Sequence, residues 1–398
     1  MSPGVFTHVD LFAGVGGFTL GFEATGLFRT KLLVDSDQSA ATTFKRNRPR
    51  VPYWVKDLRK VLPVEIIQLT EVKCGELDVL TAGPPCQGLS RVGTRQLDDE
   101  RNELLRHTAE LLDGLRPRVA IIENVPALAW EQQSSLFEEL QETLMTAGYS
   151  VAAEVLEAWR FGVPQLRRRL FIIALRSGEG SEGALFPRGT ESGQWTAQEL
   201  IRAADAGEPK CPPGLSVEEA IGDLPAIDAG GGQEVAMYNV EPLSPYQEAR
   251  RSKAQLLFNH RARTHSRKML EKMRMIGEGG RNQELPDEQR LRAVDKEYFS
   301  QAYARLHRHG IAQTITTYFH NPGSGRFIHY RDLRSITVRE AARIQSFDDD
   351  FMFLGKAEQQ MRHVGNAVPV LLAKAMGEHV AVILGAAAHA PTRAASVA

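Results

Sequence analysis

Short apolar runs that alternate with helical patterns constrain the fold of this chain more than any other feature. The runs cover residues 9–13, 31–34, 53–56, 78–82 and 119–122. Apolar residues also recur at helical spacing over 104–115 and 136–145. Strands that alternate with helices predict an α/β fold, with a doubly wound, mostly parallel, Rossmann-like sheet and a second, smaller and irregular domain.

Polar or conformationally special residues stand where these runs end. Gly14 follows the first run, and Asp35, Asp57, Cys86 and Glu123 close or follow the others. In an open parallel sheet, ligands bind outside the carboxyl ends of the strands. We therefore expect these residues to meet at one edge of the sheet and to form a ligand site there.

The glycine turn after the first run suits a bound ligand, but it does not match the dinucleotide-binding fingerprint. Gly14, Gly16 and Gly17 allow the backbone to approach a bound group closely. The dinucleotide fingerprint G-x-G-x-x-G fails, because Thr19 takes the place of the third glycine. A simple tight turn is the structural alternative.

Cys86 follows two prolines directly after an apolar run, which is a suitable place for a nucleophile. The chain has 3 cysteines, and no two of them have C-x-x-C spacing. We therefore expect neither a zinc site nor a disulfide framework. A free cysteine is more often a small buried apolar residue, so Cys86 by itself does not decide the function.

A set of ordered motifs resembles the DNA (cytosine-5)-methyltransferase family, of the bacterial type that occurs in restriction–modification systems or alone. The motifs lie at 12–17 (FAGVGG), 84–87 (PPCQ), 123–125 (ENV), 165–169 (QLRRR), 339–345 (REAARIQ) and 365–369 (GNAVP). The resemblance implies transfer of a methyl group from S-adenosylmethionine to cytosine. It covers the front and the back of the chain but not the middle.

The resemblance assigns the chemistry to four residues. Cys86, as thiolate, would add to carbon 6 of cytosine and make carbon 5 nucleophilic. Glu123 would bind N3 and the exocyclic amine as general acid. Arg169 would contact the base carbonyl, and Arg167 a nearby backbone phosphate. The target base must leave the duplex to reach Cys86. No residue can be named for removal of the carbon-5 proton, and an ordered water is a reasonable candidate.

S-adenosylmethionine is the cofactor that the resemblance implies. The residues expected around it are Phe12, Gly14, Gly16, Gly17, Asp35, Asp57, Pro84 and Asn366. Phe12 would pack on the adenine, Asp35 would bind the ribose and Asp57 the adenine amine. Relatives more often have glutamate in place of Asp35, and an aromatic residue where this chain has Ser36.

Several of these residues have structural alternatives. Glu123 could be a first-turn acid that the helix dipole favours. Arg167 and Arg169 alternate as on a solvated strand face, and Asn366 could be a turn residue. These alternatives do not explain why all the motifs occur together and in the family's order.

Contacts with DNA have to come from segregated charge, because the net charge is only −1. Residues 259–281 hold 7 Lys or Arg against 2 Glu. A helix over 263–275 would track phosphates, with a solvated face as the alternative. The expected DNA contacts are Gln87, Ser90, Gln165, Arg267, Lys268, Lys272 and Arg274. Tyr318, His320 and the turn at 323–325 would also approach DNA.

The chain divides into four predicted segments. They are a catalytic and cofactor-binding domain at 1–175, a target-recognition domain at 176–310, C-terminal motifs that return to the catalytic domain at 311–385, and a flexible tail at 386–398. With 42% hydrophobic residues and no leader or membrane-spanning pattern, we expect a monomeric cytoplasmic protein, associated with the nucleoid.

Duplex DNA is the expected partner, and a restriction endonuclease would act separately. Two other functions remain open. One is tRNA cytosine-5 methylation, although the long middle segment favours DNA. The other is a catalytically silent homologue that binds DNA, although Cys86, Glu123 and Arg169 are all present.

Overall fold

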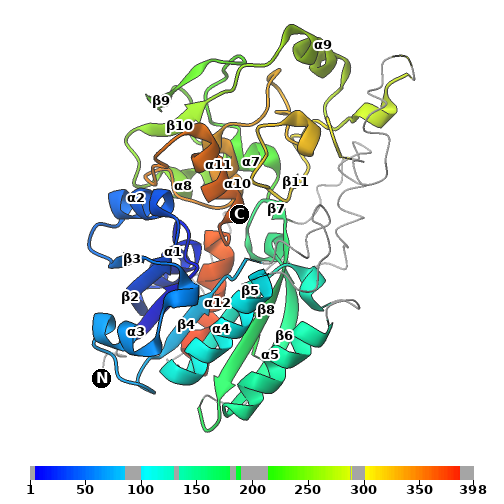
Figure 1. Cartoon of the computed structure of the whole chain (residues 1–398). Helices are drawn as coiled ribbons and strands as arrows, with labels where there is room; N and C mark the ends of the chain where they lie inside the picture. Colours follow the sequence, from blue (N-terminus) through cyan, green and yellow to red (C-terminus); the bar gives the residue numbers. More distant parts are fainter. Residues whose placement is uncertain are drawn as a thin grey trace, which may run out of the picture.

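The computed structural model describes residues 5–85, 100–129, 134–179, 185–189, 214–286, 288 and 301–385. Figure 1 shows two lobes: a lower lobe built on a layered sheet, and an upper lobe of short helices, short strands and loops. The chain starts in the lower lobe, passes through the upper lobe and returns to the lower lobe near its end.

A seven-stranded sheet forms the centre of the lower lobe. Its order is β3-β2-β1-β4-β5-β8-β6. The strands are β1 (Phe6–Leu11), β2 (Phe28–Asp35), β3 (Tyr53–Val55), β4 (Val79–Ala82), β5 (Val119–Asn124), β6 (Tyr149–Glu157) and β8 (Arg168–Arg176). The pairs from β3 to β5 are parallel, whereas β8 is antiparallel to both its neighbours. The predicted doubly wound, mostly parallel sheet is therefore confirmed.

Helices cover both faces of this sheet, which explains why its strands read as continuous apolar runs. Adjacent residues of β5 face opposite ways, so that Ile122 packs toward α4 and α5 and Ile121 toward α1 and α12. The helices of this lobe are α1 (Gly17–Ala24), α2 (Gln38–Asn47), α3 (Pro63–Thr70), α4 (Glu100–Leu115), α5 (Ser134–Thr146) and α12 (Val370–Ile383).

The upper lobe packs around Phe319, Phe347, Phe351 and Phe353, in a core that extends to Leu20 and Ala40 of the lower lobe. Its elements are α7 (Val217–Ile221), β9 (Gly232–Ala236), α8 (Pro245–Arg251), β10 (Leu257–Arg261), α9 (Arg267–Met275), β11 (Ala312–Gln313), α10 (Val338–Ile344) and α11 (Ala357–Asn366). β7 (Gln165–Leu166) pairs with β11 and so connects the lobes. Of the segment at 311–385, α12 returns to the sheet, whereas α10 packs in the core of the upper lobe.

Buried ion pairs fix the upper lobe. Arg343 donates to both carboxylate oxygens of Asp349 at 2.6 Å and also contacts Asp223. Arg334 donates to both oxygens of Glu340 at 2.8 Å. The charged residues of the motif at 339–345 are fully buried, so this motif serves the fold. Removal of one partner from such a pair leaves an uncompensated buried charge.

Among the residues that the structure describes, one stretch is long and apolar enough to cross a membrane. It is Ala357–Ile383, and 61% of its most apolar window is buried in the protein. The stretch consists of α11 and α12, which are separate helices. Helices of this kind are typical of a protein core.

Candidate active site

The glycine turn after β1 packs closely against segments that are distant in the sequence. Gly14 and Gly16 have φ angles of 52° and 81°, in the left-handed region that favours glycine. A Cβ atom at Gly17 would lie 2.4 Å from the carbonyl oxygen of Val368, so that only glycine fits. The Tyr53 hydroxyl donates to the Gly14 carbonyl at 2.8 Å. The turn is thus held rigidly at the edge of the sheet where α1 begins.

Asp35 closes β2 beside this turn. One carboxylate oxygen accepts the Gly14 N–H and the other accepts the Asp37 N–H, each at 2.8 Å. Burial raises the pKa of Asp35. A carboxylate held by two backbone donors is a fixed acceptor at the end of the second strand, where a ribose is usually bound.

Glu123 and Arg169 meet because β8 is antiparallel. The carboxyl end of β5 and the start of β8 then lie at the same edge of the sheet, and Glu123 pairs with Phe171 in the register. Arg169 Nε lies 2.9 Å from Glu123 Oε1, and both side chains are largely buried. Burial lowers the pKa of the Arg169 guanidinium, and Glu123 opposes this shift.

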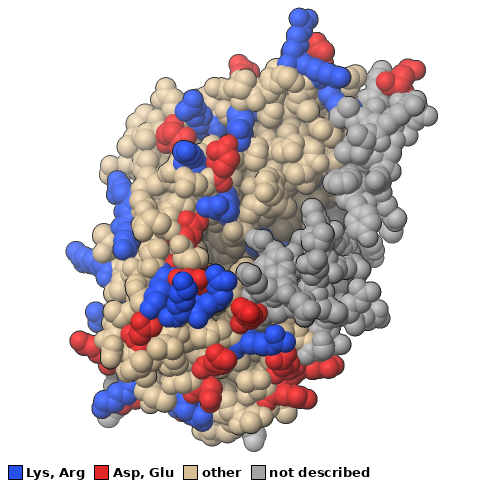
Figure 2. Space-filling view, viewed as in Figure 1, with Lys and Arg blue, Asp and Glu red and all other residues tan. Residues whose placement is uncertain are grey.

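One cavity of about 390 Å³ joins the glycine turn to this ion pair. The predicted site residues that line it are Phe12, Gly14, Gly17, Asp35, Pro84, Glu123, Arg167, Arg169 and Asn366. Pro85 also lines the cavity, and Cys86 follows it directly but lies outside the described residues. Figure 2 shows a hollow between the two lobes on this face of the molecule.

The comparisons with known proteins agree with this geometry. A family model described as C-5 cytosine-specific DNA methylase matches residues 6–381. The chain belongs to this family. It is 32% identical over 391 residues to the Type II methyltransferase M.DdeI of Desulfomicrobium norvegicum, which covers 94% of this chain and 88% of the relative. It is also 32% identical to the Type II methyltransferase M1.HphI of Haemophilus parahaemolyticus, over 94% of this chain and 86% of that one.

The chain is accordingly a DNA (cytosine-5)-methyltransferase. Its fold is similar to that of a putative DNA modification methyltransferase encoded within a prophage of E. coli. That similarity has a TM-score of 0.71 at 24% identity and covers 95% of this chain and 99% of the other. It extends to the Spodoptera frugiperda DNMT2 mutant structure, with a TM-score of 0.58 at 16% identity over 94% and 99% of the two chains.

Asp57 does not reach the cavity of this methyltransferase. Its carboxylate faces outward and forms a two-pronged pair with Arg59, at distances down to 2.7 Å. It also caps the short helix Leu58–Lys60. The expected contact with adenine therefore does not fit the position of this side chain. Gly16 does not line the cavity either, and it serves as the N-cap of α1.

Gln165 and Arg167 also have roles other than those expected. Gln165 is fully buried, with its amide nitrogen 2.9 Å from Gln345 Oε1 and its oxygen 2.8 Å from Ile315 N. Arg167 is 2% exposed and donates to the carbonyls of Ile315 and Gly365. Both side chains join the lobes. Gln165 is fully buried and does not line the cavity, whereas Arg167 can reach bound DNA only through the cavity that it lines.

The basic helix is shorter than predicted and less uniformly exposed. α9 begins at Arg267, after the Ser266 cap, rather than at residue 263. Lys272 is 7% exposed and lies over the Tyr303 ring, and its burial lowers its pKa, so it is not part of an outer phosphate-binding face. Figure 2 shows cations at the tip of the upper lobe over α9, where Arg267, Lys268 and Arg274 are exposed. Gln87 and Ser90 lie outside the described residues.

Sequence reasoning missed Asp10, a buried carboxyl in the wall of the cavity. It accepts hydrogen bonds from the hydroxyls of Thr19 at 2.7 Å and Thr81 at 2.8 Å. Burial raises its pKa to about 6. The sequence did indicate such a residue, because an aspartate inside an apolar strand run requires buried hydrogen-bond partners.

It also missed a connection between α2 and α11 at the cavity. Asp37 caps α2 and lies 3.0 Å from Arg362 Nη2, while His363 Nε2 lies 2.9 Å from the Ser39 hydroxyl. Burial lowers the pKa of His363 to about 4. No local pattern indicates this contact, because the two helices are far apart in sequence.

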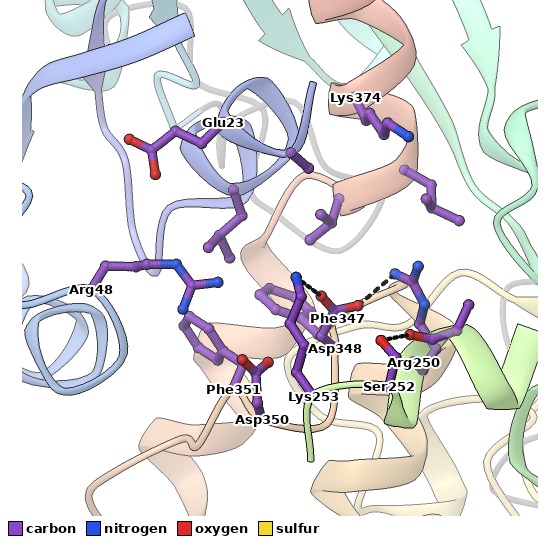
Figure 3. Close-up of a pocket in the computed structure, with 15 residues that line it drawn as sticks. Glu23, Arg48, Arg250, Ser252, Lys253, Phe347, Asp348, Asp350, Phe351 and Lys374 are labelled. Atoms are coloured by element: carbon purple, nitrogen blue, oxygen red, sulfur yellow. Dashed lines mark hydrogen bonds and ion pairs between the residues drawn. The ribbon is translucent and has the colours of Figure 1, made fainter. Parts of the chain in front are cut away.

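A second cavity, of about 450 Å³, lies where α1, α8 and α12 meet. In Figure 3, Arg250 and Lys253 both reach Asp348 at its centre. The distances are 3.0 Å and 3.6 Å, so that these charges compensate one another. None of the predicted site residues lines this second cavity. We therefore place the active site in the first cavity, which joins the glycine turn to the ion pair.

Proposed function

We propose that the enzyme transfers a methyl group from S-adenosylmethionine to carbon 5 of a cytosine extruded from duplex DNA, within a short specific sequence. The observation that carries this proposal is the Glu123–Arg169 pair, 2.9 Å apart, in the same cavity as the glycine turn and the prolines before Cys86. The substrate base and the cofactor would thus meet in one enclosed space.

The residues of the glycine turn fit S-adenosylmethionine. At Gly17 a Cβ atom would collide with Val368, whereas at Gly14 nothing lies within 4 Å, which leaves an open cradle at the mouth of the turn. Asp35 would accept from the ribose hydroxyls, and Phe12 and Asn366 line the same cavity. When bound, the cofactor supplies an electrophilic methyl group on a sulfonium.

Cys86 and Glu123 would carry the chemistry on the base. As the Cys86 thiolate forms a bond to carbon 6, negative charge develops on the ring, and Glu123 would neutralise it through N3 and the exocyclic amine. Arg169 positions Glu123 for this contact and presents its remaining donors to the base carbonyl. After transfer, loss of the carbon-5 proton would allow the Cys86–carbon 6 bond to break.

The decisive experiment is bisulfite sequencing of the genome of a host that lacks 5-methylcytosine, after expression of this protein. We expect methylation at every copy of one short sequence. Cys86→Ala and Glu123→Gln, expressed at the same level, are the controls and should leave the genome unmodified. Methylation confined to tRNA, or none with folded wild-type protein, would contradict the proposal.

Two further expectations accompany this proposal. The two methyltransferases reported above carry Type II names, which supports a separately acting restriction endonuclease as the partner in the cell. A nucleophilic thiol also suits the reducing cytoplasm, where the DNA lies. Deletion of a neighbouring nuclease gene should leave methylation unchanged, whereas deletion of the methyltransferase alone should be lethal in its presence.

A further inference from the structure

Tyr318 is an aromatic side chain that the fold leaves uncovered. It is 65% exposed, whereas Phe319 beside it is completely buried in the core of the upper lobe. Among the described Phe, Tyr and Trp residues, it is the one with a largely exposed side chain. A single exposed apolar residue is common and needs no explanation, so its position and rigidity decide whether it has a role.

The backbone that carries Tyr318 is rigid. Its carbonyl accepts the Asn321 N–H at 2.9 Å and the Ser324 hydroxyl at 2.7 Å. On the other side, its N–H donates to the Thr316 hydroxyl at 3.3 Å. With Phe319 anchored in the core, the ring has little freedom beyond its two side-chain torsions. Ordering such a ring against a partner costs little conformational entropy.

The segment just before Tyr318 also packs against residues that line the active-site cavity. The Ile315 carbonyl, three positions before it, accepts from Arg167, which lines the cavity. A Cβ atom at Gly365, another lining residue, would lie 2.6 Å from the backbone of Thr316 and Thr317. The segment that leads to Tyr318 thus packs directly against two residues that line the cavity.

We propose that Tyr318 stacks on the bases that lose their neighbour when the target cytosine leaves the duplex. This inference rests on the proposed function. Extrusion uncovers the flat faces of the flanking bases, and an aromatic ring restores that stacking independently of base identity. Tyr318 would thereby stabilise the extruded state, as a positioning residue that touches neither the cofactor nor the reacting atoms.

The test compares Tyr318→Ala, Tyr318→Leu and Tyr318→Phe with the wild-type enzyme. Unmodified genomic DNA from a host without 5-methylcytosine serves as substrate, with radiolabelled S-adenosylmethionine. We expect kcat/KM for DNA to fall about fivefold to a hundredfold in the Ala variant and nearly as far in the Leu variant, while Phe stays within about twofold. The Kd for S-adenosylmethionine should not change. Met237→Ala, at a residue 68% exposed on the upper lobe, is the matched control and should behave as wild type.

A fluorescence measurement separates stacking from other contacts. In a duplex of the methylated sequence, 2-aminopurine beside the target cytosine should be brighter with Tyr318→Ala than with wild type, because stacking quenches it. Equal kcat/KM in the Ala variant, equal values for Leu and Phe, or unchanged fluorescence would overturn the inference and leave the proposed function intact. A wild-type enzyme that transfers no methyl group to this DNA would overturn both.

Discussion

At the scale of single residues, the ion pair between Glu123 and Arg169 carries the most chemical meaning. Glu123→Gln keeps the shape of the side chain and removes its charge. We expect turnover to fall by about a hundredfold or more, because the variant lacks the proposed general acid. The free energy of unfolding should fall by no more than about 3 kcal/mol, since the amide oxygen still accepts from Arg169. Single-turnover methyl transfer and urea unfolding measure the two effects, and a variant that does not fold would make Glu123 structural.

Asp35 and Asp57 form a second comparison at this scale, since both were expected at the cofactor. Asp35→Asn replaces one acceptor of the two backbone N–H groups with a donor, so we expect about tenfold weaker binding of S-adenosylmethionine. Asp57→Ala, at an outward-facing pair with Arg59, should leave the Kd unchanged. Isothermal titration of both variants checks this, and weaker binding by Asp57→Ala would contradict the placement of that side chain.

Residues that adjoin their own strand ends could be predicted from the sequence, and residues that depend on tertiary contacts could not. Asp35 is the last residue of β2 and Glu123 is the penultimate residue of β5, so the positions of these strands placed both residues at the site. The burial of Gln165 and Arg167 depends on the backbone N–H and carbonyl of Ile315, which no local pattern reveals. For Lys272, a helix was predicted, although it begins at Arg267 rather than at residue 263, and the burial of this side chain depends on its packing over Tyr303.

At the scale of elements, the packing of α1 against α12 shows how the last helix holds the first. Gly21 lies at their contact, where a Cβ atom would be 2.5 Å from Ala373 Cβ and 2.6 Å from Lys374 N. Gly21→Ala would gain about 1 kcal/mol of helix propensity and lose about 1 to 3 kcal/mol to overpacking, so we expect net destabilisation. Gly277→Ala is the control, because nothing lies within 4 Å of its Cβ position. Thermal melting of both variants measures this effect on stability. A higher melting temperature for Gly21→Ala would mean that α12 can move aside.

The elements of the lower lobe were predictable because a buried parallel sheet needs apolar runs and its helices show regular spacing. α12 begins at Val370, directly after Pro369, where the return helix was expected. The elements of the upper lobe are short, and its core includes large rings from loops such as Phe347 and Phe353. Apolar residues in loops do not recur at a regular spacing in the sequence. The sequence could therefore predict only that this lobe is irregular.

At the scale of the whole molecule, histidines buried in both lobes make stability depend on pH. Burial lowers the pKa of His8 to about 3, and those of His329 and His363 to about 4. In the unfolded chain these rings titrate near 6.5, so below that pH the unfolded chain binds protons that the folded protein does not. The free energy of unfolding should therefore fall as pH drops from about 7 to about 5, by roughly 1 to 2 kcal/mol for each histidine.

Asp10 has the opposite effect on stability to these three histidines. The sum of the two effects gives the sign of the pH dependence that these four groups cause. Because burial raises its pKa to about 6, the folded state binds this proton more readily than the unfolded state, and stability is gained as pH falls through that value. Among these four groups, the three histidines outweigh the one carboxyl and contribute a loss of roughly 2 to 4 kcal/mol toward pH 5. Urea unfolding across this range measures it, and Asp10→Asn should steepen the loss by removing the opposing group. A free energy that stays level or rises as the solution is acidified would mean that these rings are reached by water in the folded protein.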